Sequence, residues 1–383
     1  MASHAIRSSS FLPYDRAECS QGSASCNRGH DNILPLQDRG PRMSVARVVP
    51  APDLLEREIE RPFFESFQAR ELKRTIDLTS TASGKNRNGM TIAVVSGKGG
   101  VGKSNFALNL ALSLGDSYGV RTAIIDADIG LANTDVLLGL ETRLDLGHVI
   151  RGELSVRDIV IPVAEKVWLV PGGSGITELS TVEDDNWKTI LPEILSLDDM
   201  ADILVIDAGA GINRQVLECA LAADVIALVT TPEPTALRDA YGMVKSLVHH
   251  SGHRGFSGKE ISLVINMAFS AKEALLASGR LQEVSRRFLG LDISFLGHIP
   301  HDLRISRSVK AKCPFIRMYP QSAPSHRIGE MAGRLLSEWS GRRDPEERPS
   351  QGPMKRLLSS LLTIGPQGPG RILPVISGGK EPV

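Results

Sequence analysis

The sequence predicts an α/β protein with a mostly parallel, twisted sheet and helices on both faces. Short, unbroken runs of valine, isoleucine and leucine recur along the 383 residues, and helix-length segments separate them. Strands of a parallel sheet are buried on both faces, so they read as continuous apolar runs. A glycine-rich turn lies directly between the first run and a helical pattern, as expected for a strand that leads into a helix.

The expected elements begin at Met90. The first strand (91–96) leads through the glycine-rich turn into an apolar-periodic helix (104–115). A second helix (231–250) carries prolines in its first turn, where the missing N–H is tolerated. A third helix is expected near 329–339. The remaining strands are expected at 120–128, 166–173, 201–211, 223–231, 260–268 and 291–300.

The chain outside these elements divides into segments of different composition. The first 60 residues are rich in Ser, Arg, Gly, Asp and Asn without periodicity, which indicates disorder, and a short helix is expected at 61–78. The folded domain is expected to span 90–340 and to be followed by a charged linker, 341–353. An amphipathic helix (354–364) and a disordered tail (365–383) complete the chain. The apolar face of that helix carries Met354, Leu357, Leu358, Leu361 and Leu362.

Charge and cysteine content argue against several classes of function. Basic and acidic residues balance at 44 each, which disfavours capture of nucleic acid by net charge. The four cysteines (Cys19, Cys26, Cys219 and Cys313) form no C-x-x-C pair, so neither a zinc site nor a disulfide framework is expected. No apolar run reaches the roughly 18 residues of a membrane span. A cytoplasmic enzyme is therefore expected.

The glycine-rich turn fits the phosphate-loop pattern G-x-x-x-x-G-K-[ST] at residues 97–104. A strand that enters a glycine turn and then a helix directs several backbone N–H groups at one point, where they can bind phosphate. Lys103 is expected to contact the β- and γ-phosphates, and the Ser104 hydroxyl to coordinate Mg²⁺. The expected nucleotide-binding residues of this loop are Gly97, Lys98, Gly99, Gly100, Val101, Gly102, Lys103, Ser104 and Asn105.

Aspartates end two of the buried strands. Asp126 and Asp128 close one of them, and Asp207 closes another just before Gly209. The carboxyl ends of parallel strands meet at one edge of a sheet, so these carboxylates should lie beside the phosphate loop. One of them should hold the magnesium ion and another should orient the attacking water, because phosphoryl transfer depends on positioning and charge neutralisation. The alternative is that each aspartate only caps the turn that follows it.

A second lysine, Lys98, follows the first glycine of the loop. It lies too near the start of the loop to repeat the role of Lys103 on the same nucleotide. A cation from a neighbouring subunit can neutralise γ-phosphate charge, as arginine fingers do in trans. That interpretation requires a dimer with two nucleotides at its interface. The alternative is a solvated loop lysine.

The segment KGGVGKS resembles the deviant Walker A motif of the MinD/ParA ATPases, which are P-loop NTPases. The segments DADIGLANTDVLLGL, IDAGAGI, TTPEPTALRDAYGMVK and IPHDLRISRSV, in this order between about Met90 and Leu336, resemble more narrowly the FlhG branch, also called FleN or YlxH. Its members are MinD-like ATPases that set flagellar number and placement. The resemblance implies a MinD-like fold, ATP and Mg²⁺, slow hydrolysis that a partner stimulates, and a switch from an ADP monomer to a membrane-associated ATP dimer.

The resemblance also implies roles for individual residues. Lys98 matches the signature lysine that acts across the dimer, and Asp128 matches the water-orienting residue of switch I. Asp207 and Gly209 match switch II. The expected catalytic residues are Lys98, Lys103 and Asp128. The expected magnesium ligands are Ser104, Asp126 and Asp207. The positions that contact adenine are matched by Asn266, Pro300 and Asp302.

Both ends of the chain resemble partner-binding segments of this branch. Gln68, Ala69 and Leu72 fit a short N-terminal helix that stimulates the signal-recognition-like GTPase FlhF, but Phe67 replaces its acidic residue. That segment either docks on such a GTPase or packs on its own domain. The helix at 354–364 resembles a membrane-targeting sequence for the inner face of the cytoplasmic membrane. It could equally dock in a groove of its own domain, and in the family the two states are compatible.

Other functions on the same scaffold remain open at this point. A ParA- or MinD-type ATPase could position chromosomes, the division site or another cargo, and the ParA type would need a basic patch for DNA. A metal-cluster carrier would need paired cysteines, and Cys219 and Cys313 each stand alone. A binding module without hydrolysis is opposed by the intact set of loop and strand-end residues. Flagellar basal-body components are the expected partners, and specific binding of nucleic acid is not expected.

Overall fold

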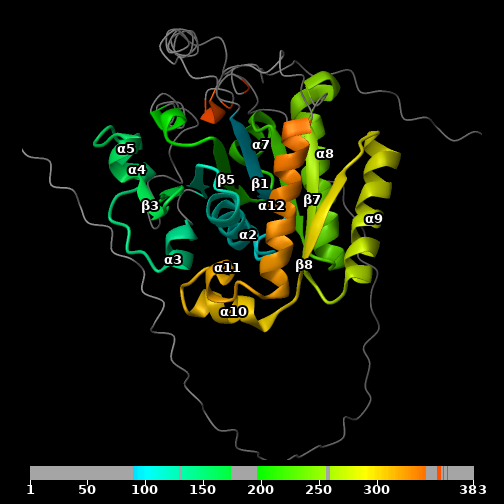
Figure 1. Ribbon diagram of the computed structural model, residues 1–383. Coiled ribbons are helices and arrows are strands. Elements are labelled where there is room, and N and C mark those ends of the chain that lie inside the picture. Colours follow the sequence, from blue (N-terminus) through cyan, green and yellow to red (C-terminus); the bar gives the residue numbers. More distant parts are fainter. Residues whose placement is uncertain are drawn as a thin grey trace, which may run out of the picture. The chain divides into compact units, whose positions relative to one another are not determined.

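An eight-stranded sheet forms the centre of the computed structural model, which describes residues 89–128, 132–173, 196–255, 259–341, 352–354, 357 and 360. The strand order is β3-β4-β2-β5-β1-β6-β7-β8 (Figure 1). Every neighbouring pair is parallel except β3 and β4. The strands are β1 (Met90–Ser96), β2 (Thr122–Ala127), β3 (Ile161–Ala164), β4 (Val167–Val170), β5 (Ile203–Ala210), β6 (Val225–Thr230), β7 (Glu260–Ala268) and β8 (Ser294–Pro300). The mostly parallel sheet is thus confirmed.

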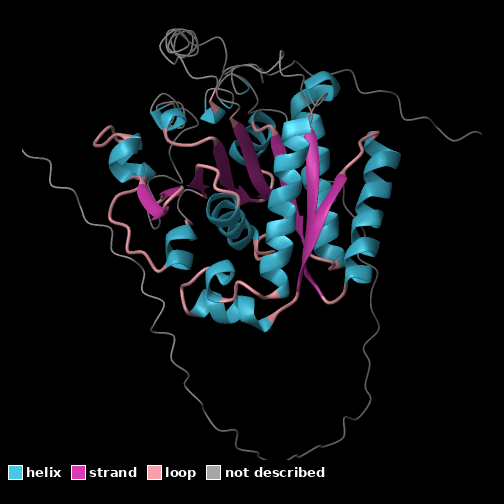
Figure 2. Ribbon diagram, viewed as in Figure 1, coloured by secondary structure: helices cyan, strands magenta, loops and turns pink. Residues whose placement is uncertain are grey.

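Helices cover both faces of this sheet, as Figure 2 shows by its colouring. One face is covered by α2 (Lys103–Leu112), its π-helical extension η2 (Ser113–Ser117), α11 (Phe315–Met318) and α12 (Ala323–Gly341). The other face is covered by α7 (Arg214–Ala222), α8 (Pro234–Gly255) and α9 (Ala271–Leu289). The short elements are α3 (Thr134–Leu138), α4 (Leu146–Ile150), α5 (Val156–Ile159), η3 (Ser196–Asp199) and α10 (Leu303–Lys310).

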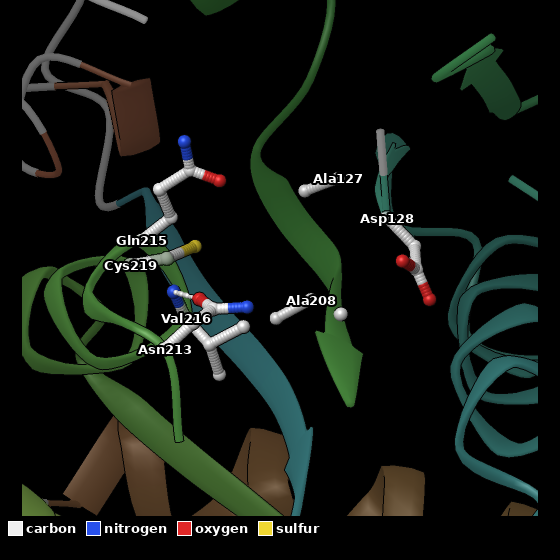
Figure 3. Close-up of a pocket in the computed structure, with 8 residues that line it drawn as sticks. Ala127, Asp128, Ala208, Asn213, Gln215, Val216 and Cys219 are labelled. Atoms are coloured by element: carbon white, nitrogen blue, oxygen red, sulfur yellow. Dashed lines mark hydrogen bonds between the residues drawn. The ribbon is translucent and has the colours of Figure 1, made fainter. Parts of the chain in front are cut away.

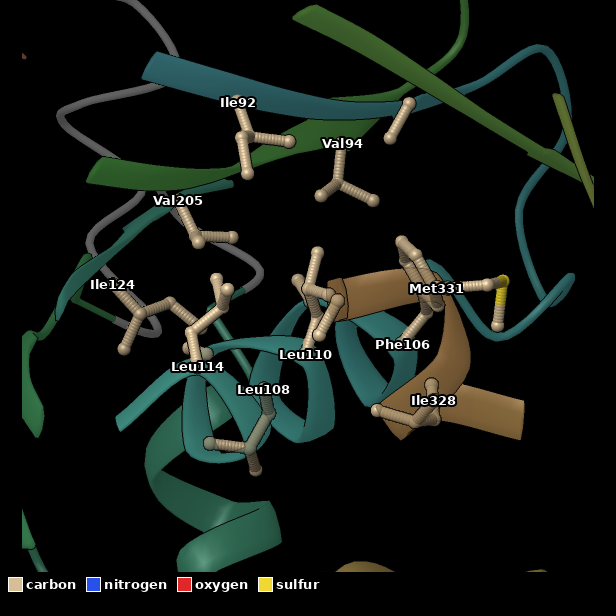
Figure 4. Packing of buried hydrophobic residues seen from close by; sticks show 14 of the residues in the cluster. Ile92, Val94, Phe106, Leu108, Leu110, Leu114, Ile124, Val205, Ile328 and Met331 are labelled. Carbon is tan, nitrogen blue, oxygen red and sulfur yellow. The ribbon is translucent and has the colours of Figure 1, made fainter. Parts of the chain in front are cut away.

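The core beneath the first face is built around α2. Figure 4 shows Phe106 and Leu110 of this helix between the sheet residues Ile92 and Val94 and the α12 residue Met331. All five side chains are at most 2% exposed. Burial of α2 on nearly all sides explains why its start, at the glycine loop, is held firmly against the end of β1.

Parallel pairing places the carboxyl ends of β1, β2, β5, β6, β7 and β8 at one edge of the sheet. The phosphate loop follows β1, Asp126 and Asp128 lie at the end of β2, and Asp207 lies near the end of β5. Asp126 pairs in register with Asp207 across these two strands. The sheet therefore gathers the sequence-predicted residues at one edge, as expected for a fold of this class.

Several elements differ from the sequence-based expectation. The helix near 329–339 is longer and begins at Ala323. The sequence analysis did not expect β3 or the helices α3, α4, α5, α7, α9, α10 and α11. The segments 1–60, 61–78 and 365–383 lie outside the described residues. The described elements from β1 to α12 run from residue 90 to residue 341, and of the linker predicted at 341–353 only the ends are described. No described helix is long and apolar enough to cross a membrane.

The C-terminal amphipathic segment lies against the domain where the structure describes it. Residues 353, 354, 357 and 360 are helical, and Met354 and Leu357 are 1% and 2% exposed. Both side chains belong to the hydrophobic cluster that includes Leu197 and Cys219. The Met354 N–H donates to the Asp198 carboxylate at 2.7 Å. Met354 and Leu357, the described part of the apolar face, are therefore buried against the chain's own domain.

Candidate nucleotide site

The glycine loop connects β1 to α2 in a space that side chains could not share. A Cβ on Gly97 would lie 2.0 Å from the backbone oxygen of Asp239 in α8. Gly102 has φ +87°, and a Cβ there would lie 2.3 Å from the Asn266 amide nitrogen. At these two positions the fold requires glycine, because larger residues would clash or strain the backbone.

The middle of the loop is open. A Cβ on Gly99 or on Gly100 would meet no atom within 4 Å. Backbone N–H groups next to such open space at a helix N-terminus can approach a phosphate closely. Val101, between them and the helix, is 4% exposed, and its carbonyl accepts a 2.8 Å hydrogen bond from Asn266. The loop is thus anchored on one side and accessible on the other.

A buried ion pair lies at the base of the loop. Lys103 Nζ contacts Asp207 Oδ1 at 2.6 Å, and the two side chains are 6% and 0% exposed. Burial raises the pKa of Asp207 to about 6, against the attraction of Lys103, which lowers it. Desolvation therefore dominates, since a carboxylate in a dry site loses its hydration. Because the Asp207 carboxylate loses its hydration in this pair, a stronger anion could take its place beside Lys103.

The same place fits a magnesium ion. Asp207 Oδ2 has no hydrogen-bond partner among the described residues, although the Ser104 hydroxyl lies close enough to lower the Asp207 pKa. A carboxylate oxygen and a hydroxyl beside a phosphate cradle are the ligands that Mg²⁺ takes in nucleotide sites. Ser104 and Asp207 therefore suit the role predicted for them.

Asp126 has a different arrangement from the one expected. It is 1% exposed, and its oxygens accept backbone N–H groups of Asp128 (3.2 Å), Asn133 (3.0 Å) and Thr134 (2.9 Å). These bonds tie the end of β2 to the start of α3. In this conformation Asp126 stabilises the backbone at Asp128, Asn133 and Thr134. Its role as a magnesium ligand stays a prediction.

Asp128 faces switch II across a small pocket. A Cβ on Gly209 would lie 3.3 Å from Asp128 Oδ1. Partial burial raises the pKa of Asp128 above its usual value, although Lys103 acts in the opposite direction. Figure 3 shows Asp128 on one side of the pocket and the start of α7 on the other. The cavity measures about 80 Å³ and is lined by Ala127, Asp128, Ala208, Gly209, Asn213, Gln215, Val216 and Cys219.

Lys98 points away from this buried centre. Its side chain is 42% exposed, its ammonium lies 3.6 Å from Glu233, and it donates to the Thr235 hydroxyl at 3.4 Å. Both partners belong to the turn and helix start after β6. The loop lysines therefore have separate places, since Lys103 lies inside its own site and Lys98 at the surface.

The residues matched to adenine contacts lie together at the ends of β7 and β8. The Asn266 amide nitrogen donates to Val101, and its oxygen accepts from the Met267 N–H at 2.8 Å. Asp302 accepts from the Arg304 N–H and pairs with its guanidinium at 2.8 Å, which lowers the Asp302 pKa. Asn266 thus braces the loop and Asp302 caps α10, and adenine contact by Asn266, Pro300 and Asp302 stays a prediction.

Cys219 is poorly suited to thiolate chemistry. Cys219 is buried, and burial raises the pKa of its thiol to about 12. Within the described residues no group of three or more histidine, cysteine, aspartate or glutamate side chains could hold a metal ion. A buried, protonated thiol is a poor metal ligand, because metals bind the thiolate.

Sequence reasoning missed Glu233 and Thr235, which hold Lys98. It named Asn266 as an adenine contact but did not predict that Asn266 holds the loop through Val101. One signal for Glu233 was its place directly after β6, at the edge where the loop lies. Nothing in the sequence links these residues by spacing.

Fold and site together define a P-loop ATPase with ATP as substrate and Mg²⁺ as its metal. The chain belongs to the CobQ/CobB/MinD/ParA nucleotide-binding domain family, which it matches over residues 92–315.

Two curated relatives are flagellar proteins. The antiactivator FleN of Pseudomonas aeruginosa is 36% identical over 64% of this chain and 86% of that protein. The flagellum site-determining protein YlxH of Helicobacter pylori is 32% identical over 71% of this chain and 90% of that protein. Among solved structures, the septum site-determining protein MinD of Pyrococcus horikoshii, complexed with Mg-ADP, is similar with a TM-score of 0.54 and 23% identity. It aligns over 66% of this chain and 99% of its own length, and this likeness concerns the fold.

Proposed function

We propose that this chain is a nucleotide-switched regulatory ATPase that controls the number and placement of flagella. The likeness to FleN and YlxH supports the flagellar role, because it covers most of both relatives. The exposed position of Lys98 is the observation that supports the proposed nucleotide switch. A lysine at the surface of the nucleotide edge can serve a second nucleotide, whereas one turned inward would serve its own.

The proposed active form is a homodimer with two nucleotides at its interface. Lys103 already occupies the cation position inside its own site, 2.6 Å from Asp207. Lys98, held by Glu233 and Thr235, can leave these exposed partners at little cost, since surface ion pairs contribute about 0–1 kcal/mol. It would then neutralise phosphate charge in the neighbouring subunit, a contribution that positioning makes large.

Nucleotide binding would change switch II through Asp207. With ATP in the loop, Lys103 would contact phosphate oxygens in place of the Asp207 carboxylate, and Asp207 and Ser104 would hold Mg²⁺. Mg²⁺, when bound, neutralises charge on the phosphates. Asp128, opposite Gly209, would orient the attacking water. The pocket between Asp128 and the start of α7 is the space that such a rearrangement of the two switches would change.

Membrane residence is proposed to follow nucleotide state through the C-terminal helix. Burial of Met354 and Leu357 keeps part of its apolar face from contact with a membrane. The Asp198 carboxylate accepts a hydrogen bond from the Met354 N–H in its first turn. Release would expose a short amphipathic helix, which binds a bilayer weakly alone. Two such helices on one dimer would bind much more tightly by effective concentration. The proposed location is therefore cytoplasmic, with peripheral attachment to the inner face of the membrane in the ATP state.

The proposed partners are an FlhF-like GTPase and basal-body components. The segment 61–78, with Phe67 in place of an acidic residue, is the part of the chain proposed to meet the GTPase. A ParA- or MinD-type positioning ATPase is the second candidate, supported by the shared family.

The test is a count of flagella per cell by electron microscopy after deletion of the gene. Cells are complemented with the intact protein or with Lys98→Ala. A changed flagellar number that only the intact protein restores is the expected result. Normal flagella with missegregated chromosomes or misplaced division would reject the flagellar role and favour the second candidate.

A further inference from the structure

Three buried hydroxyl groups lie at the edge of the sheet that carries the phosphate loop. Ser96 ends β1, Thr230 ends β6 and Thr231 follows it, and these residues are 1%, 1% and 6% exposed. None of the three hydroxyl oxygens has a hydrogen-bond partner among the described residues. A buried hydroxyl without a partner costs free energy, so its presence beside a binding site points to a state in which it is bonded.

The alternation of side chains along each strand assigns these hydroxyls to two faces of the sheet. Figure 4 shows Val94 of β1 on the face that α2 covers, and Ser96, two positions further, shares this face. Val229 of β6 belongs to the same cluster. Thr231, two positions after Val229, is therefore directed at the α2 face, and Thr230 at the opposite face, which α8 covers. The two hydroxyls of the α2 face lie beneath the loop from which α2 starts.

A third polar side chain on the α2 face already holds the loop. Asn266 of β7 is 6% exposed and donates to the Val101 carbonyl at 2.8 Å. Strands β6 and β7 pair in register up to Ile265, so Thr231 and Asn266 are neighbours at the next position. Ser96, Thr231 and Asn266 thus form a polar floor beneath the phosphate loop, here called the loop floor.

Phosphate binding by the loop creates a need for hydrogen-bond donors in the loop floor. A trans peptide directs its N–H and its C=O in opposite directions. When loop N–H groups turn toward a phosphate, the carbonyls of the same peptides turn toward the floor and need donors there. Val101 shows this arrangement, with Asn266 as its donor. Ser96 and Thr231 carry donors in the same floor that no described residue uses.

We propose that Ser96 and Thr231 are positioning residues whose hydroxyls donate to carbonyls of the phosphate loop when the loop binds a phosphate chain. They act on nucleotide affinity through the loop, without contact to the nucleotide. Each hydroxyl gains its hydrogen bond only in the bound state, so the gain adds to affinity and not to the stability of the protein without nucleotide. The proposal rests on nucleotide binding at the glycine loop and is independent of the flagellar role.

The experiment measures ligand affinity and stability of the full chain side by side. Calorimetric titration uses Mg-ADP and, separately, inorganic tripolyphosphate, and urea unfolding is followed without ligand. Thr231→Val keeps the shape of the side chain and removes the hydroxyl, so both ligands should bind about fivefold more weakly. The urea midpoint should stay the same or rise, because no bonded hydroxyl is lost from the unliganded protein. Ser96→Ala should show the same pattern, and Thr231→Ser, which keeps the hydroxyl, should bind both ligands as the wild-type protein does.

Two buried hydroxyls of the same kind serve as matched controls. Thr230 has the same side chain as its neighbour Thr231 and also lacks a partner among the described residues, but it lies on the α8 face. Ser285 of α9 is 0% exposed and has no described partner either. It lies about 20 Å along the helix from the start of α9 at Ala271. Thr230→Val and Ser285→Ala should leave both affinities unchanged, because neither hydroxyl lies in the loop floor.

Three results would overturn the proposal. The first is unchanged affinity for both ligands in Ser96→Ala and Thr231→Val. The second is a lower urea midpoint together with the weaker binding, which would mean that the hydroxyls hold the fold rather than the bound loop. The third is an equal loss of affinity in Thr230→Val. Absence of Mg-ADP and tripolyphosphate binding to the wild-type chain would contradict the nucleotide site itself, and this proposal with it.

Discussion

The buried pair of Lys103 and Asp207 allows a quantitative prediction about the protein without nucleotide. Lys103→Ala leaves the fully buried Asp207 carboxyl without its cation. Removal of one partner of a buried ion pair costs about 3–5 kcal/mol of unfolding free energy. The carboxyl can avoid much of this cost by taking up a proton, so the destabilisation should depend on pH.

The sign of this dependence follows from the pKa of Asp207. Burial already raises it to about 6 with Lys103 present, and loss of the lysine removes the attraction that lowers it. A carboxyl whose folded pKa lies above its unfolded value of roughly 3.9 is favourable in the folded protein only while it is protonated. Stability is therefore lost as the pH rises from the unfolded pKa to the folded pKa. The slope is at most about 1.4 kcal/mol per pH unit, so the loss between pH 5 and pH 7 is about 1.3 kcal/mol for a folded pKa of about 6 and approaches about 2.7 kcal/mol as loss of the lysine raises that pKa further.

The assay is urea unfolding at pH 5, 6 and 7 in the presence of a chelator and without nucleotide. The matched control is the double variant Lys103→Ala/Asp207→Asn, in which position 207 carries no carboxyl that could titrate. The single variant should lose about 1.3–2.7 kcal/mol relative to the double variant over this range. An unfolding free-energy difference between the two variants that stays constant with pH would refute the reasoning, because it would mean that Asp207 does not titrate in a dry site.

Three further predictions concern other contacts. Asp198→Ala removes the carboxylate that accepts the Met354 N–H, so the affinity of the ADP-bound protein for lipid vesicles should rise about tenfold. The control Asp199→Ala, a change at an exposed neighbour, should not alter this affinity. Asp128→Asn should lower ATP turnover about 10²-fold and leave ADP affinity unchanged, whereas equal turnover would remove its water-orienting role. Gly97→Ala should lower the unfolding free energy by at least about 1–3 kcal/mol, because its Cβ would lie 2.0 Å from a backbone oxygen, while Gly99→Ala should not change stability.

The sheet could be predicted because its central strands are unbroken apolar runs. The strand β3 was missed because it is a short, half-exposed edge strand with a proline in its second position. The helix α9 was missed for a different reason. Its buried positions include Ala274, Ser278 and Ser285, while Leu275 and Leu276 point to solvent, so apolar periodicity does not mark its buried face.

The phosphate loop and the strand-end aspartates Asp126, Asp128 and Asp207 could also be predicted, since their residue types are visible in local sequence. The partners of these residues could not. Lys98 meets Glu233 across 135 positions (233 − 98), and Asn266 meets Val101 across 165. Asp126 accepts hydrogen bonds from backbone N–H groups, which every residue except proline carries, so the identity of its partners cannot be predicted from residue type.

Mixing two inactive variants tests the central claim, that Lys98 serves the nucleotide of a partner subunit. Lys98→Ala subunits keep Asp128, and Asp128→Ala subunits keep Lys98. In a mixed dimer the site with Asp128 receives Lys98 from the partner, so an equimolar mixture should recover about a quarter of the wild-type ATPase rate, as random pairing gives half mixed dimers with one complete site each. No recovery in a mixture that forms mixed dimers would contradict the account and place Lys98 in its own subunit's site.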